Sequence, residues 1–258
     1  MGYDTGCIII TSLLGKIKIN MAAEMEEGTF KNSDNDFIYG VTVAQSSLQI
    51  RLGFIRKVYG ILSAQLLFTT LVGAFFMYNE SAKNFVQQSP NLLFIGMFAS
   101  IGLIIALGIK RKDAPMNMYL LAAFTFVEAY TIGTVVTFYD QLIVLQAFGL
   151  TMATVIALTV YTFQSKKDYS TWGAGLFSML WILILGGIMQ LFLRSELMEL
   201  GLAIAGALLF SGFIVFDTHM LIHKLSPEEY ILAAINLYLD IINLFLEILK
   251  ILNSAKRN

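Results

Sequence analysis

The sequence has few charged residues and only one cysteine. Charged side chains make up 14% of its 258 residues and apolar ones 57%, whereas about 25% of an ordinary soluble domain is charged. Together with a mean hydropathy of +0.72, this argues against a water-soluble globular domain. A lone Cys7 excludes an intramolecular disulfide and a cysteine-based metal site. The net charge of −1 provides no general attraction to polyanions, so we expect no nucleic-acid partner.

Long uncharged or nearly uncharged runs take up most of the chain. A transmembrane helix needs about 20 apolar residues, and runs of this kind occupy 58–79, 84–109, 116–138, 141–165, 169–193, 198–216 and 230–250. We therefore predict an all-α integral membrane protein, a seven-transmembrane-helix bundle over residues 51–258, with membrane lipid as its surroundings. Residues 1–50 show no sustained helical or strand period, which predicts a disordered cytosolic tail.

Basic residues are divided unevenly between the two sides of these spans. One set of alternate loops carries nine lysines and arginines, whereas the other carries only Lys83 and Arg194. Because basic residues concentrate in cytosolic loops, we expect a cytosolic amino terminus. Seven crossings would place Lys250, Lys256 and Arg257 on the far side, against the same rule. A re-entrant seventh segment would return them to the cytosol, but we favour seven crossings.

Only a few acids fall at membrane depth, where a charge costs about 2.5–3.5 kcal/mol on insertion scales. Asp217, at the end of the sixth span, and Asp240, inside the seventh, are the two that we single out. Asn236, Asn243 and Glu247 share a helical face with Asp240, which predicts a supporting polar stripe along the seventh span. Such a stripe is typical of a helix that lines a polar path. Ordinary hydrogen bonding within the bundle is the alternative explanation.

The segment between these spans predicts how the two acids are placed. Ser226 is a candidate N-cap and Pro227 a candidate first residue of the seventh helix. Asp217 would lie about 10 Å and Asp240 about 20 Å from this hinge, so tilt or an unwound turn is needed to bring them level. If they meet, they share a proton, and deprotonation adds repulsion that parts the helices. Such a pair also suits transient binding of Ca²⁺.

Three further ionisable residues have two explanations each. Glu128 in the third span is either a second acid on a cation pathway or the partner in an interhelical hydrogen bond. His219 and His223 have the spacing of zinc ligands, but no third ligand follows at motif spacing. We therefore expect them to be interfacial histidines.

Five motifs carry a resemblance to a known family. They are 54–59 (FIRKVY), 136–140 (VTFYD), 158–168 (LTVYTFQSKKD), 223–230 (HKLSPEEY) and 237–245 (LYLDIINLF). Together they resemble the transmembrane Bax inhibitor motif family, in particular its Golgi anti-apoptotic, or lifeguard four, branch. The likeness runs from about Phe37 to the carboxyl terminus.

The resemblance implies a Ca²⁺ leak channel that lowers the filling of intracellular stores and inhibits apoptosis. It implies that Asp217 and Asp240 match the pH-sensing acids of relatives. It also implies that Lys110 or Arg111, of which we favour Arg111, matches a basic residue that holds the closed state. It also implies a protein that is not an enzyme, with Ca²⁺ as permeant ion and no cofactor. Apoptosis regulators or Ca²⁺ release channels are the implied partners, and the Golgi, or alternatively the endoplasmic reticulum, is the implied location.

Two other functions remain to be weighed against a leak. A membrane adaptor would regulate cell death through partner proteins without conducting ions. An intramembrane aspartyl protease would also place two acids on neighbouring helices, but the Gly-x-Gly-Asp signature is missing before both Asp217 and Asp240. We therefore keep the adaptor as the alternative to the leak.

Overall fold

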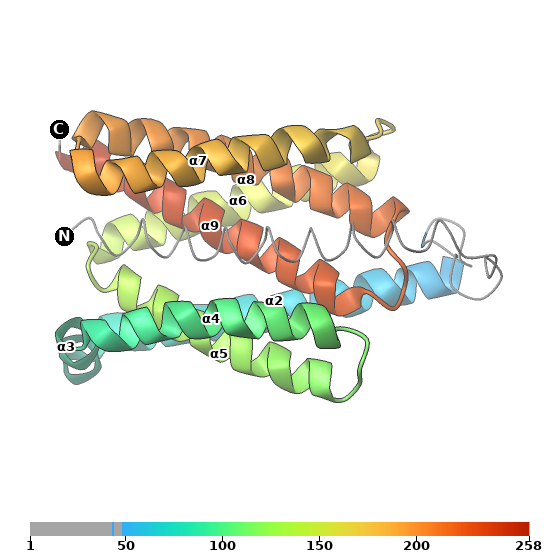
Figure 1. Cartoon of the computed structure of the whole chain (residues 1–258), viewed down its shortest axis with the longest axis horizontal. Coiled ribbons are helices and arrows are strands. Elements are labelled where there is room, and N and C mark those ends of the chain that lie inside the picture. Colours follow the sequence, from blue (N-terminus) through green and yellow to red (C-terminus); the bar gives the residue numbers. More distant parts are fainter. Residues whose placement is uncertain (1–42, 44–47, 258) are drawn as a thin grey trace.

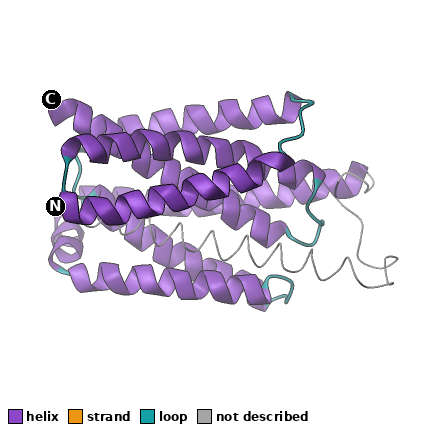
Figure 2. Cartoon of the chain, turned by 45° about the horizontal axis from the view of Figure 1, so that its top comes forward, coloured by secondary structure: helices purple, strands orange, loops and turns teal. Residues whose placement is uncertain are grey.

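The computed structural model describes residue 43 and residues 48–257, and in this part of the chain helices are the only regular elements (Figure 2). Seven helices are long and apolar enough to cross a membrane, which confirms the predicted fold class. They are α2 (Leu48–Tyr78), α4 (Pro90–Lys110), α5 (Met116–Val136), α6 (Gln141–Gln164), α7 (Gly173–Leu193), α8 (Glu196–His223) and α9 (Tyr230–Arg257). Cys7 and nearly all of the expected tail lie outside the described residues.

The helices form two groups with α9 between them. In Figure 1, α2, α4 and α5 lie together in the lower half, while α6, α7 and α8 lie together in the upper half. Helix α9 runs diagonally from one group to the other and packs on α8, α6, α2 and α5. The seventh helix is therefore the centre of the bundle.

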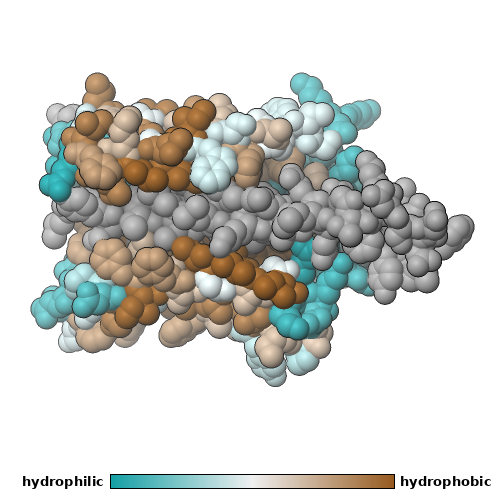
Figure 3. All heavy atoms as spheres, viewed as in Figure 1, coloured by the Kyte–Doolittle hydropathy of each residue, from teal (hydrophilic) through white to brown (hydrophobic). Residues whose placement is uncertain are grey.

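Burial separates α9 from the helices around it. In α2 and α6, 17% of the membrane-spanning stretch is buried, whereas in α9 the share is 94%. The outer helices expose large apolar side chains such as Leu71, Phe75, Leu145 and Ile182, as expected for helices that face lipid tails. Among the coloured residues on the face shown in Figure 3, hydrophobic ones lie between the two ends of the molecule and hydrophilic ones gather at the ends.

A short helix, α3 (Glu80–Gln88), follows α2 and was not expected from the sequence. The Asn79 side chain caps it by accepting the Ala82 N–H at 3.0 Å. The run that begins at residue 84 therefore does not form one span. Because proline has no N–H to donate and favours the first turn of a helix, α4 begins only at Pro90.

Helix α9 is continuous over 28 residues, or about 42 Å at 1.5 Å per residue. Its two ends lie at opposite ends of the bundle (Figure 1), so the re-entrant alternative is wrong. The basic end of α9 pairs with acids: Lys256 Nζ lies 3.0 Å from Asp140 Oδ2, and an Arg257 guanidinium nitrogen lies 3.4 Å from Glu196 Oε1. These ion pairs neutralise the charges that had seemed to conflict with seven crossings.

Candidate functional site

The register between α8 and α9 is set by a close contact of Gly206 with Glu247. A Cβ at Gly206 would lie 2.8 Å from the Glu247 carboxyl carbon, so a larger residue there would displace this side chain. The helices are antiparallel. Asp217 lies about three turns from Gly206, and Asp240 lies about two turns from Glu247, so both acids face the same interface.

Because α8 and α9 are antiparallel, equal numbers of residues counted from this contact lie side by side. The two acids therefore lie at similar positions along the helix axes. Asp217 falls level with Asn236, and Asp240 falls level with Phe213. The offset between the acids is therefore four residues, or about 6 Å along the helix axis. The sequence prediction of an offset near 10 Å was too large, because it assumed that α9 begins at Pro227.

The hinge explains that difference. The Ser226 carbonyl accepts the Glu229 N–H at 2.9 Å, and the Ser226 hydroxyl accepts the Glu228 N–H at 3.5 Å, which closes a turn instead of capping a helix. Helix α9 begins only at Tyr230. The expected helix start at Ser226 and Pro227 is therefore wrong by three residues, and Asp240 moves closer to the hinge.

We call the acids and amides of this interface the polar seam. Asp240 and Asn243 are fully buried, and the other members are at most 9% exposed. The Asn243 amide donates to the Leu239 carbonyl at 2.7 Å. The seam consists of Asp217, Asn236, Asp240, Asn243 and Glu247. All five were proposed from the sequence, and the structure brings them to one interface.

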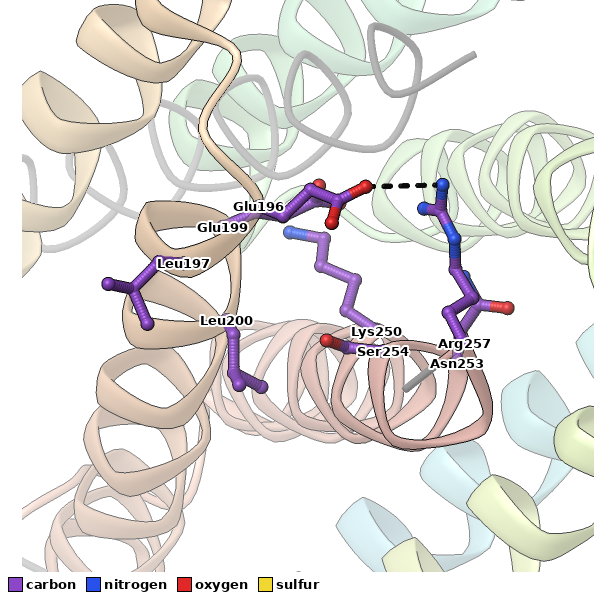
Figure 4. Close-up of a pocket in the computed structure, with 8 residues that line it drawn as sticks. All are labelled: Glu196, Leu197, Glu199, Leu200, Lys250, Asn253, Ser254 and Arg257. Atoms are coloured by element: carbon purple, nitrogen blue, oxygen red, sulfur yellow. Dashed lines mark ion pairs between the residues drawn. The ribbon is translucent and has the colours of Figure 1, made fainter.

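Glu247 marks the end of the seam that lies farther from the hinge. Its carboxylate pairs with Lys250 Nζ at 3.2 Å, and both side chains are largely buried. Beyond them a pocket of about 350 Å³ opens between the first turn of α8 and the last two turns of α9 (Figure 4). In Figure 4 Lys250 points toward Glu196 and Glu199, while Leu197 points away. The seam thus ends in a charged opening that the sequence analysis did not foresee.

Arg111 anchors the opposite end of α9. It follows α4 directly, is 4% exposed, and lies 3.4 Å from Glu229, just before α9 begins. Asp240 is eleven residues farther along, about 16 Å by helical rise. The Arg111 guanidinium therefore holds the start of α9, and its role as a latch for a closed state stays a prediction.

Glu128 lies outside the polar seam. It projects from α5 and accepts a hydrogen bond from the Ser100 hydroxyl of α4. It is 3% exposed. The interhelical hydrogen bond expected as one of its two explanations is present.

The two histidines lie at the hinge end of α8. Their rings are 4.6 Å apart, and His219 Nε2 lies 3.0 Å from Asp168 Oδ1, in the connection after α6. Hydrogen bonds from Ser170 and then His219 lower the pKa of Asp168 to about 2. Among the described residues no three His, Cys, Asp or Glu side chains could hold a metal ion together. Sequence spacing could not reveal Asp168 as a partner, because 51 residues separate it from His219.

Comparisons with known proteins agree with this architecture. Residues 51–258 match the family model described as inhibitor of apoptosis-promoting Bax1. The chain is 55% identical to the Golgi anti-apoptotic protein of Vaccinia virus (strain Lister), over 87% of this chain and 94% of the relative. It is 52% identical to protein lifeguard 4 of Mus musculus, over 91% and 99%. It is 39% identical to Bax inhibitor 1 of Schizosaccharomyces pombe, over 92% and 90%.

Proposed function

The chain belongs to the family of inhibitors of apoptosis-promoting Bax1, and from that premise we propose that it inhibits apoptosis by letting Ca²⁺ leak from an internal store through the polar seam. The Golgi is the store we propose, since the viral relative is named for it. The proposal rests mainly on the burial of Asp217 and Asp240 at one interface inside a lipid-facing bundle.

The chemistry of the seam suits a hard cation in transit. Ca²⁺ prefers oxygen ligands, and along α9 the seam offers carboxylate and amide oxygens, each about one helical turn from the next. Two carboxyl groups that meet at one buried interface do not both ionise cheaply. A shared proton holds the helices together, and its loss adds repulsion across the α8–α9 interface. Proton release is therefore the proposed trigger of the leak.

Flux into liposomes tests this directly. The full chain is reconstituted into vesicles that contain a Ca²⁺-sensitive dye, and influx is followed over a series of pH values. We expect influx to rise with pH in the wild type and to be lost in Asp217→Asn and Asp240→Asn. Asp113→Asn, an exposed acid that pairs with Lys110, is the matched control and keeps wild-type influx. Unchanged influx in both seam variants would refute the proposal.

The adaptor alternative makes a different prediction. If the protein acts through partners such as apoptosis regulators or Ca²⁺ release channels, removal of residues 1–40 abolishes protection from cell death while liposome influx stays intact. The leak proposal predicts a different pattern for Asp240→Asn, which loses influx and protection together.

A further inference from the structure

A second buried polar cluster lies on the side of α9 that faces away from the seam. Tyr238 and Asp240 are two residues apart, so their side chains leave α9 in nearly opposite directions. The Tyr238 hydroxyl lies 2.8 Å from Thr69 Oγ1, and its ring packs edge-on against Phe124 at 6.0 Å. Helix α9 is therefore flanked by polar groups on two sides.

Hydroxyls and amides connect this cluster to α5. Thr69 donates to the Gln65 carbonyl at 2.9 Å, so the hydrogen between Thr69 and Tyr238 comes from the tyrosine. The Gln65 amide donates to Thr125 Oγ1 at 2.9 Å. Glu128 follows Thr125 on the same face of α5 and is held by Ser100. We call these residues the Glu128 cluster: Gln65, Thr69, Ser100, Thr125, Glu128 and Tyr238.

The Glu128 cluster contains a carboxyl group but no cation. Ser100 is the middle residue of α4, and Glu128 lies near the middle of α5. The parts of α2 and α4 that lie at the depth of this cluster carry no lysine or arginine. Helix α5 carries no charge besides Glu128. Tyr238 is the titratable group that α9 turns toward this cluster, while Asp240, Glu247 and Lys250 lie on the seam side or farther along α9. In the described structure no ion pair to Glu128 forms.

We propose that Glu128 is a second functional carboxyl group, which binds a proton in the packed bundle and admits water and cations beside α9 when that proton leaves. A carboxylate at this depth without a cation costs several kcal/mol in burial, and binding a proton removes the charge. The Ser100 hydroxyl donates to the carboxyl oxygen in either state. This proposal uses the leak of the preceding subsection for one of its two readouts.

Infrared spectroscopy of the full chain in lipid nanodiscs provides the readout that is independent of flux. A protonated carboxyl group gives a C=O stretching band that an ionised one lacks. We expect one component of this band at neutral pH to disappear in Glu128→Gln, to shift in Ser100→Ala, and to persist in Asp240→Asn. Glu80→Gln, an exposed glutamate at the start of α3, is the matched control and leaves the band unchanged. A wild-type spectrum identical to that of Glu128→Gln would overturn the proposal.

Measurements of Ca²⁺ influx test whether Glu128 takes part in permeation, independently of whether it binds a proton. We expect Glu128→Gln to reduce Ca²⁺ influx at high pH, where the wild-type carboxyl group ionises, and to leave the dependence on Asp240 intact. Influx equal to wild type at every pH would overturn the role in permeation. If the band is lost in Glu128→Gln but the wild type conducts nothing, the proton site is confirmed and the leak itself fails. Glutamine is close to isosteric, and a circular dichroism melt checks that the variant folds.

Discussion

The two sides of α9 differ in the kind of polar groups that they bury inside the membrane. The seam side collects carboxylates and packs one of them, Glu247, directly on Gly206. The opposite side uses neutral hydroxyls and amides around a single acid, Glu128. A site with several acids changes its charge with pH, and its packing can change with it. Chains of neutral hydroxyls hold helices in place at any pH. We infer that the seam is the moving side of α9 and the Glu128 cluster the fixed side until Glu128 ionises.

For α9 to keep its place when one side is changed, its start must be anchored, and Arg111 provides that anchor. Its side chain is 5% exposed and pairs with Glu229, which is 17% exposed. Removing one partner of a buried pair leaves the other uncompensated, so Arg111→Met should lower the free energy of unfolding by about 3 kcal/mol. Titration with a denaturing detergent measures it. Lys110→Met is the control, because the Lys110 pair is exposed and exposed ion pairs contribute little to stability. Equal losses in both variants would show that α9 is not anchored there.

A substitution at Gly206 tests the tight packing of the seam. In Gly206→Ala the new methyl group must displace the Glu247 side chain, and overpacking of this kind costs about 1–3 kcal/mol of stability. Gly201→Ala, also in α8, meets nothing within 4 Å and should be neutral or slightly stabilising, since alanine favours helices. Thermal unfolding of both variants measures the difference. A Gly206→Ala protein as stable as Gly201→Ala would show that the seam tolerates a looser register.

Substitutions on the side of α9 that faces the Glu128 cluster should change the free energy of unfolding less. Tyr238→Phe removes the hydrogen bond to Thr69 but keeps the ring against Phe124, and such bonds between membrane helices are worth about 0.6 kcal/mol on average. We expect that loss in unfolding free energy and an unchanged pH dependence of Ca²⁺ influx. Tyr78→Phe, at a tyrosine that is 75% exposed, is the control. A changed pH profile in Tyr238→Phe would mean that the two sides are not separate.

The smallest effect is expected at the hinge end of α8, where Asp168 contacts His219. Hydrogen bonds, first from Ser170, place the pKa of Asp168 at about 2, below its ordinary value of 3.8. A pKa that folding depresses stabilises the protein above the ordinary value, and this contribution disappears as pH falls from about 4 toward 2. Melts over that range should show a component that Asp168→Asn lacks and Ser170→Ala reduces. Identical acid profiles in all three proteins would contradict the geometry.

Hydropathy was sufficient to predict which segments span the membrane and which acidic residues lie in them. Seven spans and the five members of the polar seam follow from runs of uncharged residues and from the spacing of Asp240, Asn243 and Glu247 along one helix. These are properties of single segments. They require no knowledge of how the helices pack, because the cost of a charge in lipid is the same wherever the helix lies.

The pairing of helix faces could not be predicted in this way. Lipid tails and the bundle interior are both apolar, so the sequence of α5 does not say that Glu128 faces Ser100 instead of α8. Nor does it say that Gly206 receives Glu247. The start of α9 was missed because Ser226 and Pro227 also suit a tight turn. Contacts between distant segments, such as Asp168 with His219, carry no periodic signal.

The central position of α9 also bears on how the protein is made. This helix carries Asp240, Glu247 and Lys250, and 94% of its spanning stretch is buried against the helices around it. Presented alone to the bilayer, it would expose those charges to acyl chains. It emerges from the ribosome after the other six, so its neighbours are already in place to receive it. Correct insertion of the last helix therefore depends on the assembly of the helices before it.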